Sequence, residues 1–201
     1  MRVAVLSGKG GAGKTLVATS LACAAGRVVY IDCDVEEPNG RLFLKPENAA
    51  SYPVTKKMPA FDREKCTGCR KCVEHCRFNA LVLVKGAPML FDEVCHSCGV
   101  CAYVCPEGAV SEAEREVGAV ETGMSGDIKV VTGELKLGEA TGVPVIAAAL
   151  AEAGPEDELS VIDCPPGSAC PVMESARRRT TACWSRSRRP SGCTTCGSWW
   201  N

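Results

Sequence analysis

A glycine-rich loop near the N-terminus has the residue types needed to bind nucleotide phosphates. Residues 8–15 read GKGGAGKT and fit the pattern G-x-x-x-x-G-K-T. Glycines let the backbone N–H groups point at phosphate oxygens, and the helix expected next adds the positive end of its dipole. Lys14 would contact the β and γ phosphates, and the Thr15 hydroxyl would bind Mg²⁺. The candidate nucleotide-binding residues are Gly8, Lys9, Gly10, Gly11, Ala12, Gly13, Lys14 and Thr15.

Three aspartates stand at the carboxyl ends of apolar runs. Asp32 and Asp34 follow RVVYI, and Asp163 follows LSVI. In a doubly wound α/β sheet, ligands bind outside the carboxyl ends of the strands, so these carboxylates are candidates for the same site. Each could instead be an ordinary turn-forming or capping aspartate, which is the commoner case for a single residue. Their occurrence at successive strand ends favours the functional interpretation.

Eight of the 15 cysteines form two runs with the same spacing, C-x-x-C-x-x-C-x-x-x-C. This spacing is typical of bacterial ferredoxins, in which the first three cysteines of a run bind one [4Fe–4S] cluster and the fourth binds the other. We therefore expect one cluster to be bound by Cys66, Cys69, Cys72 and Cys105, and the second by Cys95, Cys98, Cys101 and Cys76.

Two details bear on this interpretation. Pro106 follows the second run, as in the ferredoxin pattern, whereas Arg77 replaces the proline after the first. A positive charge there should raise the nearby cluster's potential slightly, and it removes no ligand. A pair of zinc sites is the alternative, because zinc also binds four thiolates. Zinc motifs usually pair two separated C-x-x-C elements, so three cysteines in close succession favour iron–sulfur clusters.

The elements that must position these residues can be traced along the chain. Apolar runs predict strands at 3–6, 27–32, 128–133 and 159–167, and helices are predicted at 16–25 and 144–154. A strand, loop, helix and strand in succession predict a right-handed parallel crossover. The flanking strand and helix also favour a phosphate loop over an accidental glycine-rich turn. The predicted fold class is α/β, with a doubly wound, mostly parallel sheet.

The α/β pattern is interrupted between about Pro53 and Glu112, where short apolar pieces alternate with the cysteine runs. We interpret this segment as an insert. The nucleotide-binding domain is then expected at 1–57 and 112–178, and an inserted α+β ferredoxin-type domain at 58–111.

The bulk composition excludes several classes of protein. A net charge of −1 and a pI near 6.2 provide no positive field to attract nucleic acid or an anionic membrane. No apolar run approaches the roughly 20 residues of a membrane span, and the N-terminus lacks a signal-peptide pattern. Without an export signal, 15 cysteines favour metal ligation in a reducing cytosol over disulfides. We expect a cytoplasmic protein with no membrane span and no nucleic-acid partner.

The order of these parts resembles that of one family. A phosphate loop with a second lysine, Lys9, is followed by DCDVEEPN at 32–39, the two cysteine runs and DCPPG at 163–167. This order resembles MinD-superfamily P-loop ATPases that contain an inserted two-cluster ferredoxin domain, over residues 1 to about 177. The KGGxGKT form is similar to the deviant Walker A loop of MinD, the plasmid-partition ATPases, the nitrogenase iron protein and the Mrp-type scaffold ATPases.

The resemblance implies roles for five catalytic residues. Lys14 would bind the phosphates of its own nucleotide, and Lys9 would reach those of a partner in an ATP-dependent homodimer. Asp32 and Asp34 would belong to the first switch, whose aspartate positions the attacking water. Asp163 would hold Mg²⁺ through water. A solvated lysine remains the alternative for Lys9.

The C-terminal stretch departs from this pattern. Residues 177–201 contain no Val, Ile, Leu, Met, Phe, Asp, Glu or Lys, so we expect no buried strand and an open sheet edge. A one-base frame shift near Arg178 would reread residues 180–196 as DYGLLVTEPTPFGLHDL, which the resembled family would place next. We therefore expect 179–201 to be out of frame and the sheet to lack its remaining strands. Cys193, Cys196 and the basic RSRRP at 186–190 would then have no function.

Three functions fit the sequence. The first is an ATPase that couples nucleotide binding and hydrolysis to electron transfer through two [4Fe–4S] clusters, toward a redox partner protein. The second is a ferredoxin-type electron carrier whose nucleotide fold is not catalytic. The third is an assembly ATPase that passes clusters to client proteins.

Overall fold

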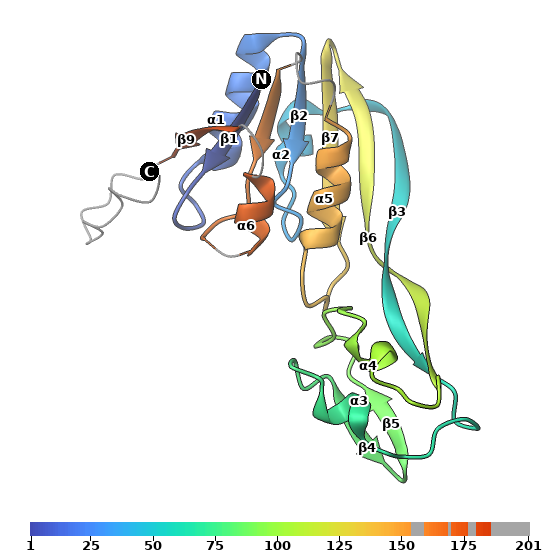
Figure 1. The fold of residues 1–201 in the computed structure, drawn as a ribbon. Coiled ribbons are helices and arrows are strands. Elements are labelled where there is room, and N and C mark those ends of the chain that lie inside the picture. Colours follow the sequence, from blue (N-terminus) through green and yellow to red (C-terminus); the bar gives the residue numbers. More distant parts are fainter. Residues whose placement is uncertain (154–158, 169, 177–179, 186–201) are drawn as a thin grey trace.

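Among the residues that the structure describes, seven strands form the main sheet in the order β3-β6-β7-β2-β8-β1-β9 (Figure 1). The computed structural model describes residues 1–153, 159–168, 170–176 and 180–185. Its strands are β1 (Arg2–Leu6), β2 (Val28–Asp32), β3 (Glu47–Phe61), β4 (Leu81–Val84), β5 (Ala87–Leu90), β6 (Val110–Ser125), β7 (Ile128–Leu135), β8 (Ser160–Asp163) and β9 (Thr180–Trp184). Its helices are α1 (Lys14–Ala25), α2 (Gly40–Leu44), α3 (Lys71–Glu74), α4 (Val100–Tyr103), α5 (Val143–Ala151) and α6 (Cys170–Ser175). Among these, no helix is both long and apolar enough to cross a membrane.

The strands β7, β2, β8, β1 and β9 are parallel and adjacent in the sheet, and helices α1 and α5 pack against this part of it. Alternate residues of a strand point to opposite faces. In β2, Val29 and Ile31 pack in a core cluster with residues of α5, whereas Val28 and Tyr30 pack with residues of α1. Burial on both faces explains why β1, β2 and β8 are mainly apolar runs in the sequence. The predicted α/β class with a mostly parallel sheet is confirmed.

Two long antiparallel strands, β3 and β6, extend the sheet beyond β7 and carry the cysteine-rich insert at their far ends (Figure 1). Neither strand was predicted from the sequence. Only Val54, Lys56 and Met58 of β3 are buried, so most of the strand is exposed and has no continuous apolar run. The predicted boundaries at 57/58 and 111/112 fall inside these strands, so the insert and the sheet share one continuous pair of strands.

The strand β9 corrects one expectation for the C-terminal stretch. Residues 180–184 pair in parallel with β1, and the N–H of Ser185 donates to the Leu6 carbonyl at 2.8 Å. The edge of β1 is therefore covered, and the sheet among the described residues ends at β9, whose Thr181 and Ala182 are exposed. Residues 177–179 and 186–201, with Cys193, Cys196 and the basic RSRRP, lie outside the described residues.

Candidate functional site

The phosphate loop joins the end of β1 to the start of α1, at the carboxyl edge of the parallel strands. Gly11 and Gly13 have positive φ angles of 72° and 79°, which favour glycine. A Cβ added at Gly8, Gly10, Gly11 or Gly13 would meet no atom within 4 Å. The four glycines thus border open space where α1 begins, which fits a group that approaches the backbone closely.

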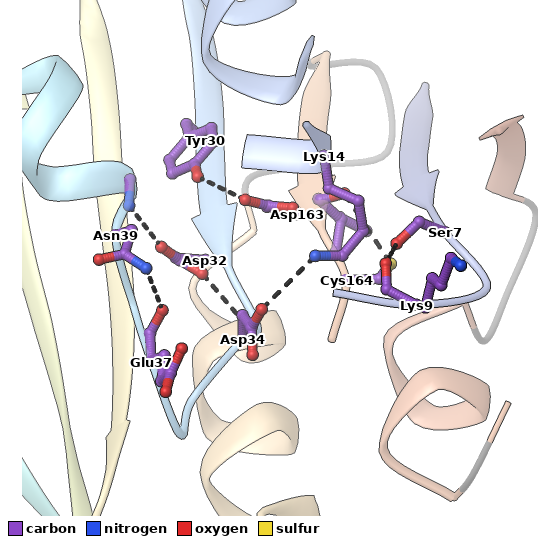
Figure 2. A network of polar contacts seen from close by, with 12 residues as sticks. Ser7, Lys9, Lys14, Tyr30, Asp32, Asp34, Glu37, Asn39, Asp163 and Cys164 are labelled. Atoms are coloured by element: carbon purple, nitrogen blue, oxygen red, sulfur yellow. Dashed lines mark hydrogen bonds and ion pairs between the residues drawn. The ribbon is translucent and has the colours of Figure 1, made fainter. Parts of the chain in front are cut away.

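Lys14 is buried at the first position of α1, and its ammonium points at Asp34 (Figure 2). The distance from Lys14 Nζ to Asp34 Oδ2 is 3.5 Å. Burial raises the pKa of Asp34, and the nearby Lys14 partly opposes this shift. Lys9 is exposed, and its ammonium points away from Asp34 in Figure 2. The two lysines of the loop therefore occupy different environments.

Asp32 is fully buried and binds the loop that follows it. Its Oδ1 accepts from the Asp34 N–H at 3.1 Å, and its Oδ2 accepts from the Gly40 N–H at 2.8 Å. Burial, followed by the charge of Asp163, raises the pKa of Asp32 to about 7, against the effect of the two N–H groups. Both oxygens are occupied by the backbone, so Asp34, not Asp32, has the carboxylate that contacts Lys14.

Asp163 ends β8 and has one oxygen without a partner. Its Oδ2 accepts from the Tyr30 hydroxyl at 3.2 Å, whereas its buried Oδ1 has no hydrogen-bond partner among the described residues. Burial raises the pKa of Asp163, and the Thr15 hydroxyl and the Lys14 ammonium oppose the shift. A buried carboxylate oxygen without a partner, close to a hydroxyl, fits the oxygen ligands that Mg²⁺ prefers.

Tyr30 and Gly40 also belong to this site, and neither was predicted from the sequence. The ring of Tyr30 lies so close to Gly40 that a Cβ there would be 2.2 Å from its hydroxyl oxygen. The signal was available, because Tyr30 is the one residue with a hydroxyl in the otherwise apolar part of β2, VVYI. Burial raises its pKa strongly, so the hydroxyl is a hydrogen-bond donor to Asp163.

The cysteines of the nucleotide-binding part differ in exposure. Cys33 and Cys164 are fully buried and directly follow Asp32 and Asp163. Burial raises the pKa of both thiols, that of Cys164 to about 12, which suits small apolar core residues. Cys23 and Cys170 are exposed, so they are not core residues of this kind.

The eight cysteines of the insert line two separate cavities that are open to solvent, with about 460 and 360 Å³ of empty space including that open solvent. Each cavity is lined by three cysteines of one run and the fourth cysteine of the other run. The larger contains Cys76, Cys95, Cys98 and Cys101, and the smaller contains Cys66, Cys69, Cys72 and Cys105. The structure thus brings together the two sets that the sequence predicted.

The two cysteine runs have the same backbone conformation. Left-handed residues recur at matching positions: Gly68 and Ser97, Arg70 and Gly99, Asn79 and Gly108. A left-handed conformation at a residue other than glycine is unfavourable and persists only where the surrounding fold imposes it. The Ala80 and Ala109 N–H groups donate to the last sulfur of each run, Cys76 Sγ at 3.4 Å and Cys105 Sγ at 3.3 Å. Such N–H groups stabilise negative charge on a sulfur ligand.

The thiols of each set surround a cavity and do not converge on the position of a single ion. Burial raises the pKa of Cys72 and Cys101. Within the described ranges, no three His, Cys, Asp or Glu side chains converge closely enough to bind a single metal ion. The donor set is four sulfurs per cavity, as a [4Fe–4S] cluster requires.

Comparisons with known proteins agree with both parts of the chain. Residues 3–174 match the model of the CobQ/CobB/MinD/ParA nucleotide binding domain. An uncharacterized protein of Methanocaldococcus jannaschii is 33% identical over 181 residues, which cover 88% of this chain and 64% of that protein. The chain thus spans somewhat less than two thirds of that relative's length.

Two shorter matches are to a pyruvate synthase subunit and to a ferredoxin. Pyruvate synthase subunit PorD of Thermotoga maritima is 33% identical over 79 residues, 37% of this chain and 80% of that subunit. An uncharacterized ferredoxin of Methanocaldococcus jannaschii is 42% identical over 53 residues, 24% of this chain and 69% of the ferredoxin. With a family match over most of its length, this chain belongs to the CobQ/CobB/MinD/ParA family of nucleotide-binding domains.

Proposed function

We propose that this protein binds Mg·ATP and two [4Fe–4S] clusters, and that it couples nucleotide binding and hydrolysis to electron transfer. One observation carries the proposal: two cavities, each lined by four cysteines drawn from both runs, lie on strands that continue the sheet of a nucleotide-binding fold. The similarity to a ferredoxin supports the iron–sulfur part, and the family supports the nucleotide part. We assign the nucleotide domain to 1–57 and 112–178, and the cluster domain to 58–111.

At the nucleotide site, each side chain has a proposed task. Lys14 pairs with the phosphates, and the loop N–H groups donate to them. Thr15 and Asp163 would hold Mg²⁺, which offsets phosphate charge when bound. Asp34 lies 3.5 Å from Lys14, so phosphates that bind Lys14 change the partner of Asp34 and thereby the loop behind it. Asp32 holds that loop through its backbone, and Lys9 would reach the nucleotide of a second copy in an ATP-dependent homodimer.

At the insert, the cysteine sulfurs would bind the clusters, which accept and donate single electrons when bound. The N–H groups of Ala80 and Ala109 stabilise the charge on two of the sulfurs. Exposed residues of the insert include Cys69 and Cys98, one at each cavity, so a redox partner protein can approach either site. We place this chemistry in the cytoplasm.

Anaerobic purification followed by iron, sulfide and EPR analysis tests the cluster part of the proposal. ATP hydrolysis, measured with the clusters oxidised and reduced, tests the coupling, with Lys14→Ala as the inactive control. We expect iron and sulfide in equal amounts and a hydrolysis rate that differs between the two redox states. An electron-transfer rate that is the same in Lys14→Ala and in wild type would instead indicate a simple electron carrier. Transfer of clusters to an apo acceptor protein would indicate an assembly protein.

A further inference from the structure

A lysine at the base of the insert is buried beside the larger cysteine cavity. Lys56, on β3, has 6% of its side chain exposed, and its Nζ donates to the Cys95 carbonyl at 3.3 Å. Cys95 is one of the four cysteines of that cavity. A buried ammonium at this place acts on the cavity with little screening by water.

The partner of Lys56 comes from the nucleotide-binding part of the chain. Glu139, in the loop between β7 and α5, has its Oε2 2.9 Å from Lys56 Nζ and only 5% of its side chain exposed. Its Oε1 accepts from Arg115 Nη2 at 2.6 Å. Arg115, on β6, also pairs at 3.5 Å with Asp92 of the insert. Charged side chains from β3, β6 and the loop before α5 thus meet where the insert begins.

Stability is a poor explanation for these buried charges. Desolvation of an ion pair costs free energy that the attraction only partly offsets, and apolar residues of similar volume often stabilise a protein as well or better. The contact between Lys56 and Glu139 is an ion pair without an aligned hydrogen bond, because Glu139 Oε2 accepts none among the described residues. The buried charges of Lys56 and Glu139 therefore indicate a role other than stabilising the fold.

Both ends of the loop that carries Glu139 contact Val35. The Leu135 N–H donates to the Val35 carbonyl at 2.8 Å. A Cβ on Gly133 would be 2.8 Å from Val35 Cγ1, and a Cβ on Gly142 would be 2.6 Å from Val35 Cγ2. The side chain of Val35 thus fits between the two glycines that enclose the loop, and a shift of Val35 must move the loop with it.

Val35 is also part of the nucleotide site, because it directly follows Asp34. The Asp34 carboxylate contacts Lys14, and the Asp34 N–H donates to Asp32. Close contacts therefore run without a break from Lys14 through Asp34 and Val35 to the loop of Glu139.

We propose that Lys56 and Glu139 form an electrostatic link through which the nucleotide and the cluster in the larger cavity influence each other. The inference rests on the function proposed above, because it needs both ligands. When Glu139 moves with its loop, its carboxylate offsets the Lys56 charge to a different degree, and the potential at Cys95 changes. Cys95 does not line the smaller cavity, so a cluster there should respond less.

The sign of the effect follows from charge. Reduction adds negative charge to a cluster, so the Lys56 ammonium raises the potential of the cluster beside it, and Lys56→Met lowers that potential. By linkage, a nucleotide that shifts the potential must bind the oxidised and reduced protein with different affinity. A change of about fivefold in Kd, at the low end of allosteric couplings, corresponds to about 40 mV for a one-electron couple at 59 mV per tenfold.

The test is an EPR-monitored redox titration of the anaerobically purified full chain, with and without a Mg·ATP analogue that resists hydrolysis. Binding of the analogue to oxidised and reduced protein gives the reciprocal measurement. The variants are Lys56→Met, and Lys56→Arg as a rescue that keeps the charge. Lys136→Met is the matched control, because Lys136 starts the same loop but forms an exposed pair with Glu116 at 3.1 Å.

In wild type, Lys56→Arg and Lys136→Met, the analogue should shift the potential of one cluster and change its own Kd about fivefold with redox state. In Lys56→Met, the potential of that cluster should fall, the other should stay, and the redox dependence of Kd should drop below about twofold. Equal iron and sulfide content and a cooperative melt show that the variant is folded. If the analogue still shifts the cluster potential in Lys56→Met, the link is overturned and the proposed function is not. The same holds if the analogue shifts no cluster potential in a wild type that binds both clusters and nucleotide. A wild type that binds no clusters or no nucleotide overturns the proposed function, and the link with it.

Discussion

Asp32 and Asp163 lie directly opposite each other at the ends of the neighbouring parallel strands β2 and β8, yet their carboxylates have different partners. Both oxygens of Asp32 accept backbone N–H groups of the following loop. Asp163 accepts from Tyr30 and keeps one oxygen without a hydrogen-bond partner in the described part of the chain. Two aspartates that look equivalent in sequence therefore differ in their contacts: Asp32 fixes the following loop, and Asp163 keeps one oxygen available for the Mg²⁺ that we propose.

Asp32 should make the free energy of unfolding depend on pH. Burial, with the nearby Asp163 second, raises its pKa from 3.8 to about 7. The folded state holds this proton more tightly than the unfolded state, so the stabilisation is complete below the unfolded pKa and is lost as the pH rises toward 7. Between about pH 4.5 and 7.5, wild type should therefore lose on the order of 2 to 4 kcal/mol more stability than Asp32→Asn. Urea unfolding of both proteins measures this difference, and parallel pH curves would contradict it.

The two lysines of the phosphate loop should have separable effects. Lys14→Ala removes the buried ammonium beside Asp34 and should weaken ATP binding by about 10- to 100-fold, as expected for a charged hydrogen bond. Lys9→Ala removes an exposed ammonium that points away from Asp34, so the monomer should still bind ATP while ATP-dependent dimerisation is lost. Calorimetry and light scattering distinguish the two. Equal loss of ATP affinity in both variants would argue against different tasks.

Pairs of substitutions can test whether the fourth cysteine of each run binds the cluster of the other run. Cys76 lies in the cavity of Cys98, so Cys76→Ser with Cys98→Ser should remove one cluster and leave half of the iron. Cys76→Ser with Cys69→Ser should damage both clusters, because Cys69 lies in the other cavity. Iron content and EPR report the result. The reverse outcome would show that each run binds its own cluster.

Gly40 and Gly8 should respond differently to a methyl group. Gly40→Ala places a Cβ 2.2 Å from the Tyr30 hydroxyl oxygen, in a buried region, and should destabilise the fold by about 1 to 3 kcal/mol. Gly8→Ala meets no atom within 4 Å and should leave the free energy of unfolding unchanged, but it should weaken ATP binding because the methyl group enters the phosphate space. Thermal melts and ATP titrations of both variants check this. A stable Gly40→Ala would mean that Tyr30 can move aside.

Much of this architecture could be predicted because it depends on local pattern. The parallel strands are apolar runs, the phosphate loop has a fixed spacing, and the cysteine spacing already specified which sets would meet. The strands β3 and β6 escaped because their pairing is long-range and the sequence of β3, ENAASYPVTKKMPAF, contains two prolines and no continuous apolar run. The edge strand β9 escaped because it pairs through its backbone with little burial.

Other features depend on contacts that no local pattern records. Lys56 and Lys57 are adjacent in sequence, yet the Lys56 side chain is buried against Glu139, whereas the Lys57 side chain is 68% exposed. Likewise, only the hydrogen bonds distinguish Asp32 from Asp34. Alternation along a strand decides which lysine faces inward, and the sequence predicted no strand there.

The most direct test of the central claim is a single-turnover measurement of cluster oxidation. The reduced protein is mixed with a one-electron acceptor dye in the presence of Mg·ATP, of Mg·ADP or of neither, and the loss of the cluster EPR signal is followed in time. Coupling predicts that ATP changes the oxidation rate, that ADP does not reproduce the change, and that Lys14→Ala abolishes it. Identical rates under all three conditions, in a protein that holds both clusters and binds ATP, would contradict the account.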